Sequence, residues 1–410
     1  CLLVCSHVNF PHSPRRRASE ARASTRSLAE QLEMRAGRGR GRARCDRRQT
    51  GHGEGSDAPR AATIVGTCVD MCPPRERQWR EKERLLHPFE IIDGTESDAR
   101  PKADRNKAIK QFSRSAAGQR EATSDELRPP DVLLKTTAYL MRMIAPSCRG
   151  DSWTDTYHFV WDRLWAVRQD MTIQGLNGGE CIKILEQAVR FYVYSAFRCF
   201  EEDMNAFDPH INNQHLQECL KRLLVQYQQF AVDQCGNRPE MEAIYILHNL
   251  GSFDALAHAM TLPKEIRNHS LVKISLDTSL AHRKGNFVRV LRNYRALRPI
   301  LACALHSHLE LIRRTALQVM AVAFSSQNCK FPLSTLGRWL GCSENTAREL
   351  CHLYQLPVQD SEVKFLKGRG DFTLKQSKKH RDSALVKVLT KSDISTLLCP
   401  DNERQPCQGS

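Results

Sequence analysis

The feature that most constrains the fold is a helical periodicity that begins at Asp131 and continues through residue 323. Apolar residues recur every three to four positions in this stretch, and it shows no strand-like alternation. Asp131 follows two prolines and precedes an apolar run, which is typical of a helix N-terminus. Leu133, Thr137 and Met141 then share one helical face. This pattern predicts a long series of helices.

The predicted helices have ordinary lengths and short connections, which favour antiparallel pairs stacked as in a solenoid. No exact sequence repeat is visible, so the repeat should be irregular. We therefore expect a mainly α fold with an irregular helical-repeat platform over residues 63–328. The helices are expected at residues 132–144, 154–170, 178–200, 212–233, 240–259, 264–276, 286–298 and 299–323.

A different pattern begins at Lys330. Residues 331–340 read as a short helix, Gly341 and Cys342 as a turn, and 344–353 as a second helix. Two strand candidates follow, at 362–366 and 371–374, with a glycine-containing turn between them. This order is typical of a small winged helix, which we assign to residues 329–374.

Both ends of the chain are polar and basic. Residues 1–62 are rich in Arg, Gly, Ser and Ala without an apolar period, so they are expected to be a disordered tail. Its Arg-Gly-Arg-Gly-Arg run, residues 38–42, either binds RNA or is a passive tail. Residues 375–410 are expected to be a second basic, weakly ordered tail, with weak helical content at 383–398. Residues 1–10 lack a preceding basic region, so no signal peptide is expected.

Order is expected to begin near Thr63 with a compact, turn-rich segment, residues 66–74. A charged helix over 75–86 follows, opened by two prolines. A short basic helix is expected over 106–115.

Composition narrows the class of protein. The chain has a net charge of +15 and 41% hydrophobic residues, enough for a sizeable core. It contains no run of about 18 apolar residues, so no membrane span is expected. Many of the 16 cysteines lie inside apolar helical runs, which favours reduced thiols in the cytosol or nucleus.

The sequence carries no signature of a catalytic site. It lacks the phosphate loop, the His-Glu-x-x-His zinc motif and the nucleophile elbow. Cys68 and Cys72 are spaced by three residues and have no matching second pair, whereas structural zinc takes four ligands. We therefore expect a non-enzymatic protein with no metal, no cofactor and no small-molecule substrate.

The most unusual segment combines bulky apolar side chains with four charges, Asp162, Arg163, Arg168 and Asp170. Acids and bases three or four residues apart form weak surface pairs by default. The alternative that we favour is a buried network that links this helix to its neighbours, since guanidinium groups pair well with carboxylates.

Basic residues also gather in two places that could contact nucleic acid. One is the helix around 286–298, where Arg289, Arg292, Arg295 and Arg298 alternate with apolar residues. The other is the wing and the segment after it, at Lys364, Lys367, Arg369, Lys375, Lys378 and Lys379. A solvated surface is the alternative for both.

Several of these segments resemble the SAC/GANP/leucine-permease-regulator family. They are the opening Gly-Thr-Cys-Val-Asp-Met-Cys-Pro at 66–73, Phe-Ser-Arg-Ser-Ala-Ala at 112–117, and Leu-Arg-Pro-Pro-Asp-Val-Leu at 127–133. The most specific is Phe-Val-Trp-Asp-Arg at 159–163, followed by Ala-Val-Arg-Gln-Asp at 166–170. The resemblance covers residues 64 to about 370.

The resemblance implies a tetratricopeptide-like, PCI-like helical platform that ends in a winged helix and acts as a scaffold. It implies protein partners, a PCI-domain subunit and a small acidic subunit, and a part in messenger-RNA export. A small animal member is linked to centrosome duplication and the mitotic spindle. The implied locations are the nucleus and cytoplasm, with the centrosome and spindle.

The large family members also carry phenylalanine–glycine repeats before this region and a long centrin-binding helix after it. Neither is visible in this sequence, so centrin binding and direct nuclear-pore docking are not expected. The alternative function that the residues leave open is direct RNA or DNA binding through the basic surfaces.

Overall fold

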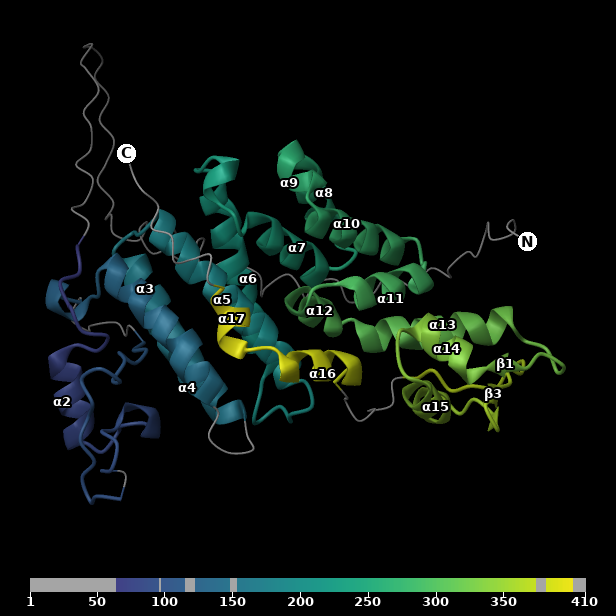
Figure 1. Cartoon of the computed structure of the whole chain (residues 1–410), viewed down its shortest axis with the longest axis horizontal. Helices are drawn as coiled ribbons and strands as arrows, with labels where there is room; N and C mark the ends of the chain where they lie inside the picture. Colours follow the sequence, from purple (N-terminus) through teal and green to yellow (C-terminus); the bar gives the residue numbers. More distant parts are fainter. Residues whose placement is uncertain (1–63, 96, 115–121, 148–152, 374–380, 401–410) are drawn as a thin grey trace, which may run out of the picture. The chain divides into compact units, whose positions relative to one another are not determined.

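Residues 64–373 and 381–400, except 96, 115–121 and 148–152, are described by the structure, a computed structural model. The predicted disordered tail, residues 1–62, lies outside the described residues. The first described element is α2, Pro74–Lys82 (purple in Figure 1), which begins at Pro74 as the proline pair indicates. The predicted helix at 106–115 is wrong, since residues 105–107 form a turn and 108–114 have no regular structure. Hydrogen bonds from the main chain and side chains of these residues to neighbouring segments hold them in place instead.

The platform consists of helices joined by short turns (Figure 1), as the sequence predicted. Their bounds are α3 Pro130–Tyr139, α4 Trp153–Ile173, α5 Gly179–Arg198, α6 Pro209–Tyr227, α7 Arg238–His248, α8 Phe253–Thr261, α9 Lys264–Asn268, α10 Ser270–Arg283, α11 Phe287–Ala296, α12 Pro299–His306 and α13 Leu309–Ala323. A π-helical turn, Leu140–Ile144, continues α3.

Three predicted helices are each two helices in the structure, because local turn chemistry interrupts the periodicity. The predicted helix at 240–259 is broken at Gly251, which has a φ of +74°. The one at 264–276 is interrupted at His269, whose extended backbone caps α10 while its side chain accepts a hydrogen bond from the backbone N–H of Leu271. The one at 299–323 is interrupted between His306 and Leu309.

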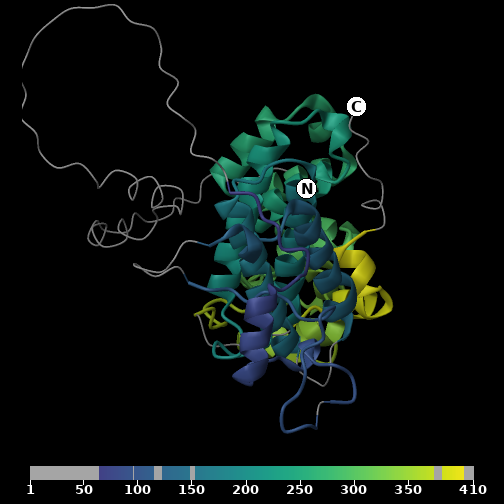
Figure 2. The same cartoon turned by 90° about the vertical axis from the view of Figure 1, so that its left-hand side faces the viewer.

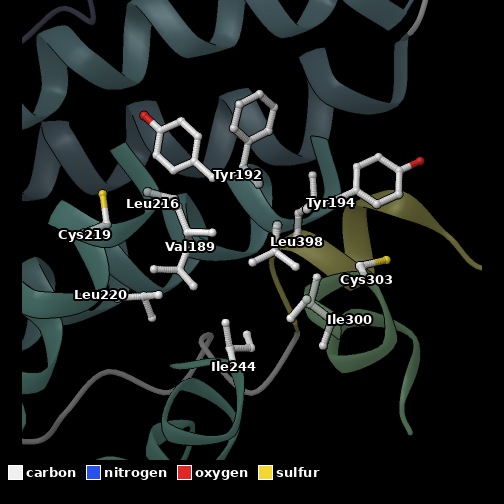
Figure 3. Packing of buried hydrophobic residues seen from close by; sticks show 14 of the residues in the cluster. Val189, Tyr192, Tyr194, Leu216, Cys219, Leu220, Ile244, Ile300, Cys303 and Leu398 are labelled. Atoms are coloured by element: carbon white, nitrogen blue, oxygen red, sulfur yellow. The ribbon is translucent and has the colours of Figure 1, made fainter. Parts of the chain in front are cut away.

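Helix α5 lies at the centre of the platform core. Fifteen of its 20 residues are buried, as expected of a helix that other helices surround. It packs against α3, α6 and α12. Figure 3 shows this cluster, with Val189 and Tyr192 of α5 beside Leu216 of α6. None of the helices in the described ranges is long and apolar enough to span a bilayer.

The winged helix follows the platform. It consists of β1 Phe331–Pro332, α14 Leu333–Leu340, α15 Glu344–Leu353, β2 Val358–Gln359 and β3 Glu362–Val363. The strands form an antiparallel sheet in the order β1-β3-β2, in which Val363 pairs with both Phe331 and Val358. The second helix has the predicted bounds, whereas the first begins two residues later than predicted because Phe331 and Pro332 form β1. The predicted hairpin of 362–366 with 371–374 is wrong, because residues 362–363 pair with the preceding strand and residues 371–373 are not in a strand.

A second hydrophobic core lies under this sheet and contains Leu336, Ala347 and Phe365. Leu317 and Met320 of α13 are buried in the same core. The predicted boundary at residues 328 and 329 therefore separates α13 from side chains that it packs against. We propose a module that begins with α13.

The C-terminal segment folds back onto the platform. Helices α16, Ser383–Lys391, and α17, Ile394–Leu398, contact α12 and α5 respectively. Leu398 is fully buried and lies beside Tyr194 and Ile300 (Figure 3). Figure 2 shows this segment, in yellow, on the outside of the stacked helices. The two helices coincide with the weak helical content expected at 383–398, but the sequence did not predict that this segment packs on the platform.

Candidate functional site

The charged block of α4 connects the helix to the opening segment of the chain. Asp170 is fully buried, and its Oδ2 accepts a hydrogen bond of 2.8 Å from Nε of Arg128, which is also fully buried. Its Oδ1 accepts one of 2.7 Å from Nζ of Lys110. Because these partners precede α4 in the chain, the carboxylate of Asp170 fastens two earlier segments to it.

A second buried carboxylate, Glu90, pairs with two guanidinium groups. Its Oε2 lies 2.6 Å from Nη1 of Arg80 and 3.2 Å from Nη2 of Arg163, and its Oε1 accepts from the backbone N–H of Ile109 at 3.0 Å. Burial by itself would raise the pKa of Glu90, but the charges of Arg163 and Arg80 outweigh burial and lower it. Glu90 is thus held as a buried anion.

The other two charges of the block face different neighbours. Asp162 pairs with Arg163 and accepts a hydrogen bond from the backbone N–H of Phe112 at 3.3 Å. Arg168 points to α6, where it donates to Glu218 at 2.6 Å and to Nδ1 of His215 at 2.8 Å. Burial, together with the charge of Arg168, lowers the pKa of His215 to about 4. A neutral imidazole can accept the bond that Arg168 donates.

The opening motif packs against the same charged groups. Gly66 donates its backbone N–H to Oε1 of Gln174 at 2.8 Å, and a Cβ at Gly66 would lie 2.5 Å from the carbonyl oxygen of Leu127. Glycine is therefore required by close contact. Cys72 is fully buried beside Arg80, and burial raises its thiol pKa to about 12. Such a thiol behaves as a small packed group.

The residues that the structure describes contain no candidate metal site. Within the described ranges, no three or more His, Cys, Asp or Glu side chains are grouped so that they could hold a metal ion. Cys68 donates a hydrogen bond to the carbonyl oxygen of Asp70, and burial raises its pKa.

The predicted basic face of α11 is exposed. Arg289 forms an ion pair of 2.8 Å with Asp277, both of them partly exposed. Arg292, Arg295 and Arg298 are exposed to solvent. The helix packs its other face on α10 and α14, so Arg292 and Arg295 remain on its surface, and Arg298 follows it at the N-cap of α12.

In the winged helix, α15 has a mixed surface. Asn345, Glu349 and His352 are exposed. Arg348, the single Lys or Arg of this helix, donates to the carbonyl oxygen of Asp360 at 2.7 Å and lies 3.6 Å from Glu344. Lys367 and Arg369 are exposed after β3, whereas Lys378 and Lys379 lie outside the described residues.

Sequence reasoning did not identify the partners of the charged block. Lys110, Arg128 and Glu90 lie far from α4 in the chain, and none carries a local pattern that signals burial. The Leu-Arg-Pro-Pro at 127–130 was visible only as part of the family resemblance. Sequence reasoning also did not identify a further buried ion pair. Arg313 pairs with Asp382 at 2.9 Å and donates to the carbonyl oxygens of Leu340 and Gly341.

These observations define the class of protein: a helical-repeat platform with an appended winged helix, whose most distinctive charged residues pair with one another inside the fold. Comparison with known sequences is more specific. The SAC3/GANP family matches residues 71–360, and the chain belongs to this family.

Relatives are found in fungi, animals and plants. SAC3 family protein 1 of Schizosaccharomyces pombe is 30% identical over 73% of this chain and 31% of its own length. Protein xmas of Drosophila melanogaster is 30% identical over 72% of this chain and 15% of its own length. SAC3 family protein B of Arabidopsis thaliana is 26% identical over 76% and 19%. The chain therefore spans less than a third of each of these relatives.

Proposed function

We propose that the chain is a non-enzymatic scaffold that binds partner proteins through its helical platform and its winged helix. The observation that carries the proposal is that its most distinctive charged side chains pair with one another inside the fold. Asp170, Glu90 and Arg163 are buried and paired within the fold, so the most specific block of the sequence serves to assemble a platform. Membership of the SAC3/GANP family supports the same function.

The surface of α15 favours a protein partner over the groove of DNA. A groove-reading helix presents several basic or amide side chains to base edges. Here Arg348 is engaged by Asp360 and Glu344, and the exposed face carries Glu349, which repels phosphate. The proposed partners are a PCI-domain subunit, packed against the winged helix, and a small acidic subunit.

The proposed process is messenger-RNA export, centrosome duplication with organisation of the mitotic spindle, or both. Its support is the resemblance of the opening motif and of the α4 block to this family. The proposed locations are the nucleus and cytoplasm, with the centrosome and spindle. A fluorescently tagged chain observed through the cell cycle tests these locations.

Direct RNA or DNA binding is the second candidate function. The observation that favours it is the exposure of Arg292 and Arg295 on α11 and of Arg298 at the N-cap of α12, with Lys367 and Arg369 exposed after β3. Binding through several phosphates weakens steeply as salt rises, because counterions are released on association. A packed protein interface depends less on salt.

Two variants of the full chain separate these functions. The first, Asn345→Arg with Glu349→Arg, changes the exposed face of α15. The second, Lys367→Glu with Arg369→Glu, reverses the charge of the wing. Each is used in a pull-down from cells with mass spectrometry and in a titration with single-stranded RNA at low and high salt.

We expect the α15 variant to lose protein partners that the unmodified chain retains at high salt. The wing variant should keep those partners and bind RNA more weakly. Loss of partners in the wing variant, with unchanged RNA affinity, would show that the two surfaces are assigned the wrong way round. If the chain binds RNA in the titration but the pull-down recovers no protein partners, direct RNA or DNA binding is favoured.

A further inference from the structure

A pocket of about 520 Å³ lies where α5, α6, α7 and α12 meet. Its volume lies within the range of about 300–1,000 Å³ that is typical of ligand sites. The charged block of α4 contributes no side chain to its wall, so the pocket is a separate feature of the platform. Amides of the wall bond to other groups of the wall: Oδ1 of Asn213 lies 2.5 Å from Nε2 of His248, and Gln217 donates to Asn249 at 2.8 Å. These bonds fix the wall without any ligand.

Three helices end at this pocket. Each places its C-cap residue in the wall: Cys199 of α5, Asn249 of α7 and Ser307 of α12. The C-terminus of a helix carries a partial negative charge, so it favours a cation nearby. Helix α6 begins at the pocket instead, but the carboxylate of its N-cap, Asp208, accepts hydrogen bonds from its first backbone N–H groups and offsets their positive charge. The backbone around the pocket therefore favours positive charge.

The side chains of the wall have the same preference. Within the described part of the chain, Glu202 is the one acidic side chain that lines the pocket, and no Lys or Arg does. Glu202 is half-buried, and no residue that the structure describes forms an ion pair with its carboxylate. Burial lowers the pKa of His248 and of His306 to about 4, and it lowers the pKa of His308 as well, so these histidines are neutral near pH 7.

Two arginines lie near the pocket but outside its wall. Arg381 is paired with Glu201 at 3.0 Å, and neither Arg381 nor Arg198 lines the pocket. Burial, followed by the charge of Glu202, raises the pKa of Cys199 to about 12, whereas Arg198 and Arg381 each have a smaller, opposing effect. Neither arginine therefore outweighs Glu202 at this point of the wall.

The apolar part of the wall suits an aliphatic chain. Phe197, Phe207 and Leu216 are buried side chains in it, and Phe200 is half-buried. Leu216 of α6 and Cys303 of α12, which also lines the pocket, belong to the core cluster of Figure 3. Lysine and arginine pack their methylene groups on apolar surface and keep the charged end among polar groups. Phenylalanine rings also attract cations.

We infer that the pocket binds a basic side chain, arginine or lysine, of a partner protein, with the charged end beside Glu202 and the methylene groups against the phenylalanines. An anion has no Lys or Arg of the wall to pair with. An uncharged ligand would cover Glu202 without supplying a partner, which is unfavourable for a carboxylate. A metal ion is not expected, since the described residues include no group of three His, Cys, Asp or Glu side chains that could hold one. The inference rests on the proposed scaffold function, because the side chain belongs to a protein partner.

The test uses the full chain and capped amino acids as probes. N-acetyl-argininamide and N-acetyl-lysinamide are titrated while protein NMR signals are followed. N-acetyl-citrullinamide and N-acetyl-norleucinamide are their controls, because they have similar shapes and no charge. We expect the tighter basic probe to bind with a dissociation constant on the order of 1 mM, which is reasonable for a ligand of this size. Its uncharged counterpart should bind at least about tenfold more weakly, since charge-assisted bonds to a carboxylate are stronger than neutral ones.

Matched variants locate the site. Glu202→Gln removes the charge and keeps the shape, so it should weaken the basic probe at least about fivefold and the uncharged probe less than about twofold. Glu202→Lys should weaken the basic probe further, because the new ammonium group repels it. Glu265→Gln makes the same chemical change at an exposed position of α9 outside the wall, and should change the affinity less than about twofold. Since Glu202 is only half-buried, its variants should fold.

A pull-down from cells tests whether the cation belongs to a partner protein. Glu202→Lys should lose at least one protein partner that the unmodified chain and Glu265→Gln both retain. The inference is overturned if neither basic probe binds, if an uncharged probe binds as tightly as its basic counterpart, if Glu202→Gln leaves the affinity unchanged, or if Glu202→Lys keeps every partner. Failure of the scaffold function gives a different result. In that case the pull-down of the unmodified chain recovers no protein partners, while the basic probes still bind the pocket.

Discussion

Replacing Asp170 with alanine should destabilise the platform strongly, because the carboxylate joins two earlier segments to α4. Arg128 is fully buried. Without Asp170 it keeps one long hydrogen bond, of 3.3 Å, from Nη1 to the carbonyl oxygen of Met71. Removing one partner of a buried ion pair costs about 3–5 kcal/mol, since the remaining charge stays buried without compensation. For a folded unit of a few hundred residues, this corresponds to a fall of about 4–7 °C in the melting temperature.

A matched control and a double variant make this prediction specific. Asp277→Ala breaks a pair with Arg289 in which both side chains are partly exposed, and it should cost less than about 1 kcal/mol. Arg128→Met combined with Asp170→Leu removes both buried charges and should recover most of the lost stability.

Differential scanning calorimetry of the full chain, with urea unfolding followed by circular dichroism, provides the measurement. The double-variant cycle gives the coupling between the two residues. If Asp170→Ala melts within about 1 °C of Asp277→Ala, the pair contributes no more than a surface pair does. That result would refute the claim that the buried carboxylate holds the opening segment to α4.

Three further predictions concern other contacts. Gly66→Ala should lower the melting temperature measurably, because its Cβ would meet the carbonyl oxygen of Leu127 at 2.5 Å, while Gly236→Ala, with open space around it, should not. Asp382→Ala removes both the N-cap of α16 and the partner of Arg313, so hydrogen exchange in α16 should accelerate far more than it does in Asp393→Ala, where only the exposed N-cap of α17 is lost. His306 has an ordinary pKa of 6.5 that burial lowers to about 4 in the folded chain. Between these two pH values the unfolded state therefore binds more protons than the folded state. The contribution of His306 to the free energy of unfolding is complete above pH 6.5 and is lost as the pH falls toward 4. His306→Gln should flatten the fall in urea midpoint between pH 6.5 and 4.5, and an unchanged slope would contradict this.

Helix positions in the winged helix were predictable because their signals are local. Ser343 caps α15 by accepting a hydrogen bond from the backbone N–H of Thr346, which is the pattern that its sequence position predicts. Gly341 ends α14 with a φ of +62°, a conformation that glycine adopts readily. Such signals involve residues within one turn of each other, so they can be read without the rest of the fold.

The strands and the C-terminal segment were predicted less well, for a related reason. Residues 358–359 and 362–363 form strands two residues long, too short for an alternating pattern to show. Residues 375–410 are polar and basic as a whole, yet Leu385, Leu389 and Leu398 within them are buried against the platform. Burial of three leucines on a surface that other helices provide cannot be seen within the segment that carries them.

The sequence by itself determined the helical class, most helix starts, and the unusual charge of the α4 block, because helix periodicity and capping depend on neighbours along the chain. Only the tertiary structure decided which charges meet. Asp170 pairs with Arg128, 42 positions away, and Arg313 with Asp382, 69 positions away. A pocket of about 520 Å³ is likewise lined by residues of four helices, α5, α6, α7 and α12. A charged residue looks the same in sequence whether it faces water or a buried partner, and the packing of distant helices decides which of the two it meets.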